Sequence, residues 1–222
     1  MKKNLTIALL LLAAAPLSAQ NWSLGAGTGA FAFGDFVRRT MRGPASPDQP
    51  AVTSTLTLSA AVRPGLAVDL QRDFGERWGL RFEGAFTRSP LSIEDSHGDE
   101  ATIQAGDLDV STFMVPIVFR INRGGALRFH VLAGPAYAIY KPHGPQNADA
   151  SITVFKGSRS EWGGAAGLGA AWRWSNRFAI EGEITDIVTA SPFHRHDFPN
   201  TPGLKIPKPH NVHTKLGVRY RF

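Results

Sequence analysis

The sequence lacks cysteine, and outside residues 5–15 it lacks any apolar run approaching a membrane-spanning helix. Without cysteine there is no disulfide, no thiol chemistry and no lipid attachment at a cysteine. A spanning helix needs about 20 apolar residues, so a mature chain that enters a membrane must do so as strands of a closed barrel. The net charge is +6. Its basic residues are scattered singly, whereas a nucleic-acid surface needs them clustered, and we expect no nucleic-acid partner.

The first residues have the pattern of an export signal. Lys2 and Lys3 precede the apolar stretch 5–15, which is about half as long as a spanning helix. Leu-Ser-Ala at 17–19 then offers a cleavage site. We predict a cleaved signal peptide over residues 1–19. The remainder, residues 20–222, is of ordinary size for one domain.

Period-two alternation dominates the rest of the chain, and helical periodicity is nearly absent. Residues 108 and 110 are apolar but out of phase with the apolar residues from 113 onward, which predicts a β-bulge near Ser111 or Thr112. The alternation predicts eight strands, at about 22–33, 66–74, 78–88, 107–121, 127–140, 161–174, 178–186 and 210–222.

The connections between these strands alternate between short turns and loops of about twenty residues, such as the polar segment 89–106. An even strand number with this alternation is typical of outer-membrane barrels, whose short turns are periplasmic. The predicted fold is all-β, an eight-stranded antiparallel up-and-down transmembrane barrel with four long extracellular loops.

Charged residues fall on one face of the predicted strands, opposite the large apolar and aromatic residues. An eight-stranded soluble carrier would be apolar inside, so this pattern favours a barrel with a charged lumen and a lipid-facing exterior. Glu181 and Glu183 are the expected partners of the cations on the last strand. The lumen charges are predicted to be Asp69, Arg81, Glu83, Arg128, Arg173, Glu181, Glu183, Lys215, Arg219 and Arg221.

The tryptophans lie at predicted strand ends rather than at mid-strand. Barrels in membranes carry aromatic girdles at both interfaces. We predict that Trp22, Trp78, Trp172 and Trp174 form the periplasmic girdle, with Trp162 at the opposite interface.

Several stretches resemble the small outer-membrane β-barrel family, the porin-family proteins similar to the OmpX, OmpW and opacity types. They are RPGLAVDLQRDFGERWGLRFEGAF (63–86), STFMVPIVFRI (111–121), FHVLAGPAYAIY (129–140) and GGAAGLGAAWRW (163–174). The resemblance implies location in the cell outer membrane, contact with its lipid and lipopolysaccharide, and a monomer. The closing segment is similar to the carboxy-terminal signal read by the outer-membrane assembly machinery, through Lys215, Gly217, Tyr220 and Phe222.

Two groups of residues were candidates for chemistry. His194, His196 and Asp197, with His210 and His213 nearby, could bind a divalent metal, but the proline-rich segment around them indicates an exposed polar loop. His130 is the mid-strand histidine that a lipid A modifying enzyme would need, yet its alternation phase points it into the lumen. We predict no catalytic residue, no metal and no cofactor.

Eight strands leave an interior that side chains fill, so we expect no steady conductance. Loops on a rigid scaffold are where binding usually occurs. The leading hypothesis is a non-enzymatic scaffold that presents surface loops to the envelope, other cells or an extracellular ligand. A narrow porin-like channel is the alternative, and a lipid A modifying enzyme is the third.

Overall fold

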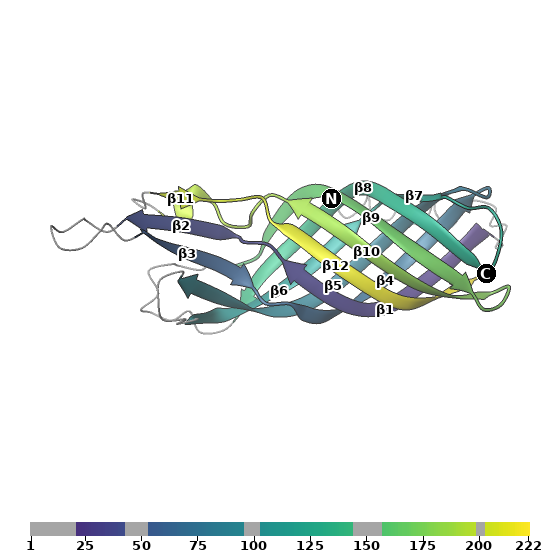
Figure 1. The fold of residues 1–222 in the computed structure, drawn as a ribbon, viewed down its shortest axis with the longest axis horizontal. Helices are drawn as coiled ribbons and strands as arrows, with labels where there is room; N and C mark the ends of the chain where they lie inside the picture. The colour runs from purple at the N-terminus through teal and green to yellow at the C-terminus, as the bar shows by residue number, and fades with distance from the viewer. Residues whose placement is uncertain (1–20, 43–52, 96–102, 144–156, 199–202) are drawn as a thin grey trace, which may run out of the picture.

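The computed structural model describes residues 21–42, 53–95, 103–143, 157–198 and 203–222. The predicted signal peptide lies outside these residues. Within them the chain is almost entirely β-strand (Figure 1), with a short 3₁₀ turn, η2 (Arg195–Asp197). None of the described residues form a helix that is long and apolar enough to cross a membrane.

Eight antiparallel strands close into a barrel, which confirms the predicted fold. Val115 and Pro116 interrupt one of them, but its two parts, β6 and β7, keep the same register against β5 and count as one barrel strand. The interruption follows from Pro116, which has no N–H to donate. The barrel strands are β1 (Trp22–Phe33), β4 (Arg63–Phe74), β5 (Trp78–Asp95), β6 (Ile103–Met114) with β7 (Ile117–Arg120), β8 (Leu127–His143), β9 (Arg159–Arg173), β10 (Phe178–Thr189) and β12 (His210–Arg221).

The barrel closes where the first strand meets the last. In the β1–β12 pair Gly27 lies opposite Gly217, and the N–H of Phe222 donates to the carbonyl of Trp22 at 3.1 Å. Pairing between β5 and β6 completes the ring on the other side. The aromatic carboxy-terminal residue is therefore tied to the first strand by a backbone hydrogen bond.

The two ends of the barrel differ. The turn end carries the short connections 75–77, 121–126 and 174–177, and the carboxyl end of the chain lies there (Figure 1). At the extension end β2 (Val37–Arg42), β3 (Thr53–Ala60) and β11 (Leu204–Lys205) carry the sheet beyond the barrel, because β3 pairs with the far part of β5. The sheet therefore continues beyond the barrel at the extension end.

The predicted long loop 89–106 is wrong over most of its length. β5 continues to Asp95 and β6 begins at Ile103. The predicted bulge near residue 111 is also wrong, because β6 alternates without interruption there and Leu108 and Val110 point inward together with Thr112. The register shifts instead between Leu91 and Ser92.

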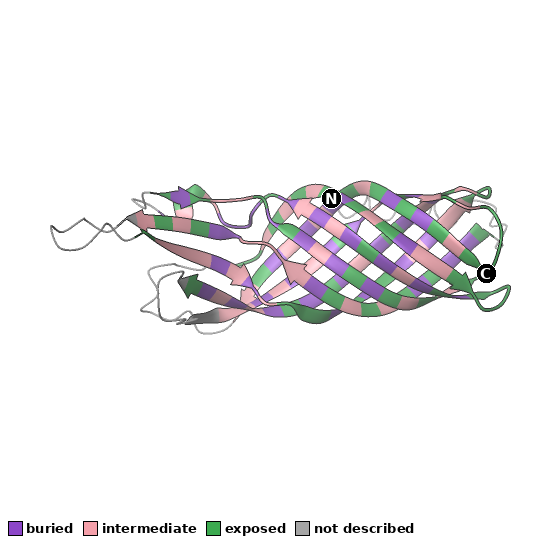
Figure 2. Cartoon of the chain, in the orientation of Figure 1, coloured by how far each residue is buried: buried purple, intermediate pink, exposed green. Residues whose placement is uncertain are grey.

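Alternation along the strands separates two faces, and Figure 2 shows buried and exposed residues following one another along each strand. The outward face of the barrel carries large apolar side chains that are not covered by protein. Examples are Leu24, Leu66, Val68, Phe82, Phe86, Phe113, Ile117, Phe129, Val131, Leu168, Ile184, Leu216 and Val218. This apolar band is the surface that a bilayer would cover.

Candidate functional site in the barrel interior

A network of buried charges, the charged layer, crosses the middle of the lumen. It consists of Asp69, Gln71, Arg81, Glu83, His130, Glu181, Glu183, Lys215 and Arg219. Arg81 is its centre and is 1% exposed. Its Nη1 donates to Glu183 at 2.6 Å and its Nη2 donates to Glu181 at 2.8 Å. The Nε group donates to the Gln71 side chain at 3.0 Å.

The strand order explains why Arg81 matters. Its strand, β5, is separated from β10 by β4, β1 and β12 on one side of the ring and by β6, β8 and β9 on the other. The two strands therefore face each other across the barrel, and the Arg81 ion pairs with Glu181 and Glu183 span the lumen. The Arg81 guanidinium therefore connects opposite walls of the barrel at that level.

The last strand supplies two more cations to the same layer. Lys215 Nζ lies 2.7 Å from Glu83 Oε2, 3.4 Å from Asp69 and 3.6 Å from Glu183. Arg219 lies 2.5 Å from Glu181 and 2.8 Å from Asp69. Three cations are thus in close contact with four carboxylates, each carboxylate pairing with at least one cation. Such pairing is what makes buried charge tolerable, because each ion loses its water.

His130 completes the layer from β8. Its Nε2 lies 2.9 Å from Glu183 Oε2 and 3.6 Å from Glu181. The ring occupies the space that Gly169 leaves on the neighbouring strand, where a Cβ would come within 2.6 Å of His130 Nε2. A Cβ at this position would also come within 2.9 Å of the Gly182 carbonyl oxygen, so glycine makes room for the histidine ring.

Not all the predicted lumen charges join this layer. Arg128, Arg173 and Arg221 lie instead at the turn end, where they line a separate pocket. Sequence reasoning missed Arg120 in the same pocket. The signal was present, since Ile117 and Phe119 point outward and the alternation therefore turns Val118 and Arg120 inward.

Towards the extension end the interior becomes apolar. We call this cluster the apolar plug: Phe36, Val37, Leu58, Ala60, Leu91, Ile93, Leu108, Val110, Ala138, Tyr140, Phe193, Phe198 and Leu204. Phe36 and Phe193 are fully buried, with ring centroids 5.9 Å apart. The Tyr140 hydroxyl lies 2.9 Å from Thr189 Oγ1 and accepts a hydrogen bond from Asn211 at 2.9 Å. Sequence reasoning missed the plug because it assigned most of its residues to loops or next to a bulge, although Ala138 and Tyr140 were placed in a strand.

The segment after β10 folds back onto the barrel to help form this plug. Ser191 Oγ donates to the Phe36 carbonyl at 3.0 Å, and Arg159 Nη1 donates to the Pro192 carbonyl at 2.7 Å. Arg159 also donates to Asp197 at 2.6 Å. This hydrogen bond lowers the pKa of the Asp197 carboxyl to about 2. The segment is therefore anchored to the barrel wall by both apolar and ionic contacts.

The histidines considered as metal ligands do not converge on one point. The rings of His194 and His196 are stacked with centroids 5.3 Å apart, but Asp197 is held by Arg159. His210 pairs with Asp186 at 2.8 Å, and His213 is buried against Phe31 with centroids 4.5 Å apart.

A second group has the spacing of a metal site. His130, Glu181 and Glu183 bring their ligand atoms within 4.8 Å of one another. Both carboxylates already accept hydrogen bonds from Arg81, however, and a divalent cation would lie against that guanidinium. We assign no metal to this group.

The tryptophans of the predicted girdle differ in exposure. Trp78, Trp162, Trp172 and Trp174 have at least half of their surface free of protein, whereas Trp22 is 9% exposed. The Arg72 guanidinium lies 5.5 Å from the Trp22 ring centroid and contributes to covering it.

Closed strand pairing, an apolar outer band and a charged interior define an outer-membrane β-barrel. The sequence pattern of the family described as "Outer membrane protein beta-barrel domain" matches residues 5–222, and the chain belongs to this family. It is therefore located in the cell outer membrane, with the turn end periplasmic and the extension end extracellular. No curated protein sequence matches the chain.

Solved structures with the same fold are small outer-membrane proteins. OprG from Pseudomonas aeruginosa superposes with a TM-score of 0.62 at 13% identity, covering 91% of this chain and 96% of that one. AlkL, solved in lipid bilayers, gives 0.52 at 10% identity and covers 94% of both chains. Neisserial surface protein A gives 0.51 at 8% identity, covering 90% and 97%. At these identities the likeness is one of fold.

Proposed function

We propose that this outer-membrane protein is a non-enzymatic, non-conducting scaffold that presents its extracellular extension to anionic partners at the cell surface. The observation that carries the proposal is the filled lumen. Arg81 bridges opposite walls within the charged layer, and Phe36 and Phe193 are fully buried in the apolar plug. A solute would have to separate both layers to pass, which argues against the narrow channel.

The position of His130 supports a non-enzymatic role. A lipid A modifying enzyme must bring its catalytic histidine to the lipid, but His130 is 5% exposed and lies against Glu183 inside the barrel. Its neighbours include Arg81, which neutralises the same carboxylate. This arrangement fits a structural ion-pair layer better than an acid–base pair that meets substrate.

The extracellular extension provides the binding surface. A hollow of about 370 Å³ lies between β2 and the segment before β12, lined by Gly34, Asp35, Arg38, Lys205, Ile206, Pro207, Lys208 and His210. Arg38 pairs with Asp35. Lys205 and Lys208 make no ion pair with any described residue, and this excess positive charge favours an anionic ligand such as the phosphates of an envelope glycolipid.

The test compares variants that differ in this hollow. We expect K205Q/K208Q to weaken binding of the purified protein to lipopolysaccharide by about tenfold or more, whereas K141Q, an exposed lysine of β8, should bind like wild type. Surface plasmon resonance with immobilised lipopolysaccharide measures both. Equal binding by all three proteins would contradict the proposal, and a mobility shift on boiling would show that each variant is folded.

Other partners stay predictions. Outer-membrane lipid should surround the apolar band, and the assembly machinery should read Lys215, Gly217, Tyr220 and Phe222. The side chain of Lys215 also belongs to the charged layer. Its replacement would therefore affect both assembly and stability, which makes Tyr220 and Phe222 the cleaner positions for testing the signal.

A further inference from the structure

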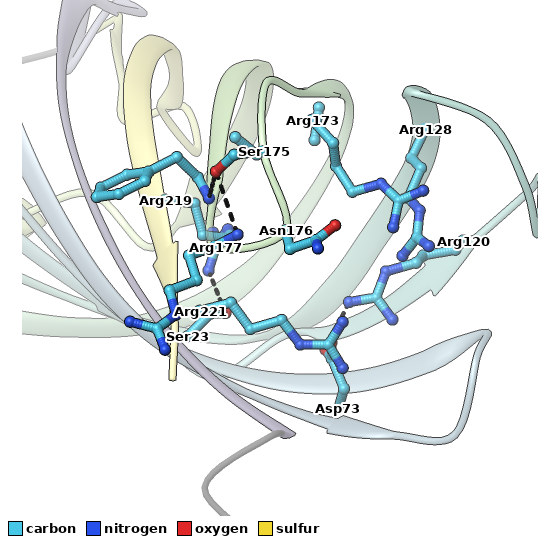
Figure 3. A pocket seen from close by; sticks show the side chains of 13 residues that line it. Ser23, Asp73, Arg120, Arg128, Arg173, Ser175, Asn176, Arg177, Arg219 and Arg221 are labelled. Carbon is cyan, nitrogen blue, oxygen red and sulfur yellow. Dashed lines mark hydrogen bonds and ion pairs between the residues drawn. The ribbon is translucent and has the colours of Figure 1, made fainter.

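The periplasmic mouth of the barrel is lined by arginine. A pocket of about 80 Å³ opens at the turn end, and Figure 3 shows the side chains that surround it. The neutral polar groups Ser23, Ser175 and Asn176 also line it. Asp73 is the carboxylate among its lining residues. The cations are Arg120, Arg128, Arg173, Arg177, Arg219 and Arg221.

The charges in this pocket are not balanced. Arg120 pairs with Asp73 at 2.5 Å, and Arg219 belongs to the charged layer above. Arg128, Arg173 and Arg177 make no ion pair with any described residue. Figure 3 shows Arg128 and Arg173 extending towards the same space as Arg120. This contrasts with the charged layer, where each cation contacts at least two carboxylates.

The surroundings of Arg128 do not compensate its charge. Its Nε is buried without a hydrogen-bond partner. The charges that act on it are those of Arg173, Arg120 and Arg221, all repulsive, together with the attraction of Asp73. Cations held together in this way are stabilised when an anion enters between them.

We propose that the pocket binds a phosphate-class oxyanion. The planar guanidinium fork donates two parallel hydrogen bonds to phosphate oxygens, and several forks from different strands suit a group with three or more acceptor oxygens. Arg128 comes from β8 and Arg173 from β9, while Arg177 lies in the turn that follows. A bound oxyanion would link these strands at the mouth. This site is at the opposite end of the barrel from the extracellular hollow. The two proposals are therefore independent of each other.

Two sources can supply this chemistry at the periplasmic face: a soluble phosphate compound or the headgroup of an anionic phospholipid. The protein in nanodiscs of phosphatidylcholine, titrated calorimetrically with pyrophosphate, tests the soluble source. The protein in mixed nanodiscs, analysed by native mass spectrometry for retained phosphatidylglycerol, tests the lipid source. Binding in either arm supports the site and identifies its source.

The variants decide whether the arginines are responsible. We expect R128Q/R173Q to lose at least tenfold in affinity for pyrophosphate, or to lose the retained phosphatidylglycerol. R123Q, an exposed arginine of the turn before β8 that does not line the pocket, should match wild type. The affinity of wild type should also fall as sodium chloride is raised. Absence of binding in both arms, or equal binding by R128Q/R173Q and wild type, would overturn the proposal, provided that the boiling-dependent mobility shift shows both proteins folded.

Discussion

The charged layer and the apolar plug fill the same lumen by opposite means. In the charged layer Arg81 and its carboxylates stabilise one another, so each member depends on its partners. In the plug, burial of side chains such as Phe36 and Leu108 away from water lowers the free energy of the folded state. Each side chain contributes to stability largely on its own. The difference teaches that two layers inside one barrel can have different sensitivities to mutation. The variants below separate the two layers.

The largest effect is expected in the charged layer. R81M leaves Glu181, Glu183, Asp69 and Glu83 with too little compensating charge. Removing one partner of a buried ion pair costs about 3–5 kcal/mol. Unfolding by urea in lipid vesicles measures the loss.

The matched control for R81M is on the same strand. Arg88 pairs with Asp109 at 2.5 Å but its side chain is 61% exposed. Water screens an exposed ion pair, so it contributes little to stability, and R88M should unfold nearly like wild type. Equal losses in the two variants would show that Arg81 is not the centre of a dry network.

The plug should respond in the manner of an ordinary core. Leu108 is fully buried, and L108A should lower the free energy of unfolding by about 2–5 kcal/mol through lost burial and a cavity. The same urea experiment applies. L66A removes the same atoms from the outward face, where lipid fills the space, and should cost less; a greater loss in L66A would place the stabilising core outside the barrel.

A smaller effect is expected from the hydroxyl of Tyr140. Y140F leaves Thr189 and Asn211 without this buried partner, which costs about 1–3 kcal/mol. Tyr137 faces outward against Trp162, so Y137F serves as the control and should be close to neutral. If both variants unfold alike, the Tyr140 hydrogen bonds contribute nothing measurable to the plug.

The smallest effect is local and depends on pH. The pKa of Asp197 is lowered to about 2 by Arg159, so its contribution is fully present above the ordinary aspartate pKa of about 4 and is lost as pH falls through about 2. The His194 N–H donates to Asp197 at 2.7 Å. Amide hydrogen exchange at His194 should therefore be less protected at pH 2 than at pH 5. D197N should weaken that protection at pH 5. Unchanged protection both at pH 2 and in D197N would contradict the role of Asp197 in anchoring the segment after β10.

Alternation in the sequence predicted the barrel because lipid and lumen impose it on every strand. β1 was placed at its observed bounds, and the charges of β5 and β10 were placed on the inward face. The ion-pair partners across the lumen were harder to predict from the sequence. Lys215 was expected to pair with Glu181 or Glu183 on the adjacent strand, but its shortest contact is to Glu83 on β5. Such pairing depends on the curvature of the ring, which a single strand does not encode.

The extension was missed for a different reason. Ser89 and Pro90 resemble the start of a loop, but Ser89, Leu91 and Ile93 continue the inward phase of β5 and are buried. Leu108 and Val110 are indeed out of phase with Phe113, but they point inward, and the β-bulge inferred to reconcile them with the outward face was wrong. The interior changes from charged to apolar along its length, and a single inside–outside rule cannot describe both parts.

The central claim is that these two layers close the lumen, and conductance tests it most directly. Wild-type protein in planar lipid bilayers should give no steady current at 1 M potassium chloride, with R81M showing more frequent openings than R88M. A stable ohmic conductance from the wild-type protein would contradict the account.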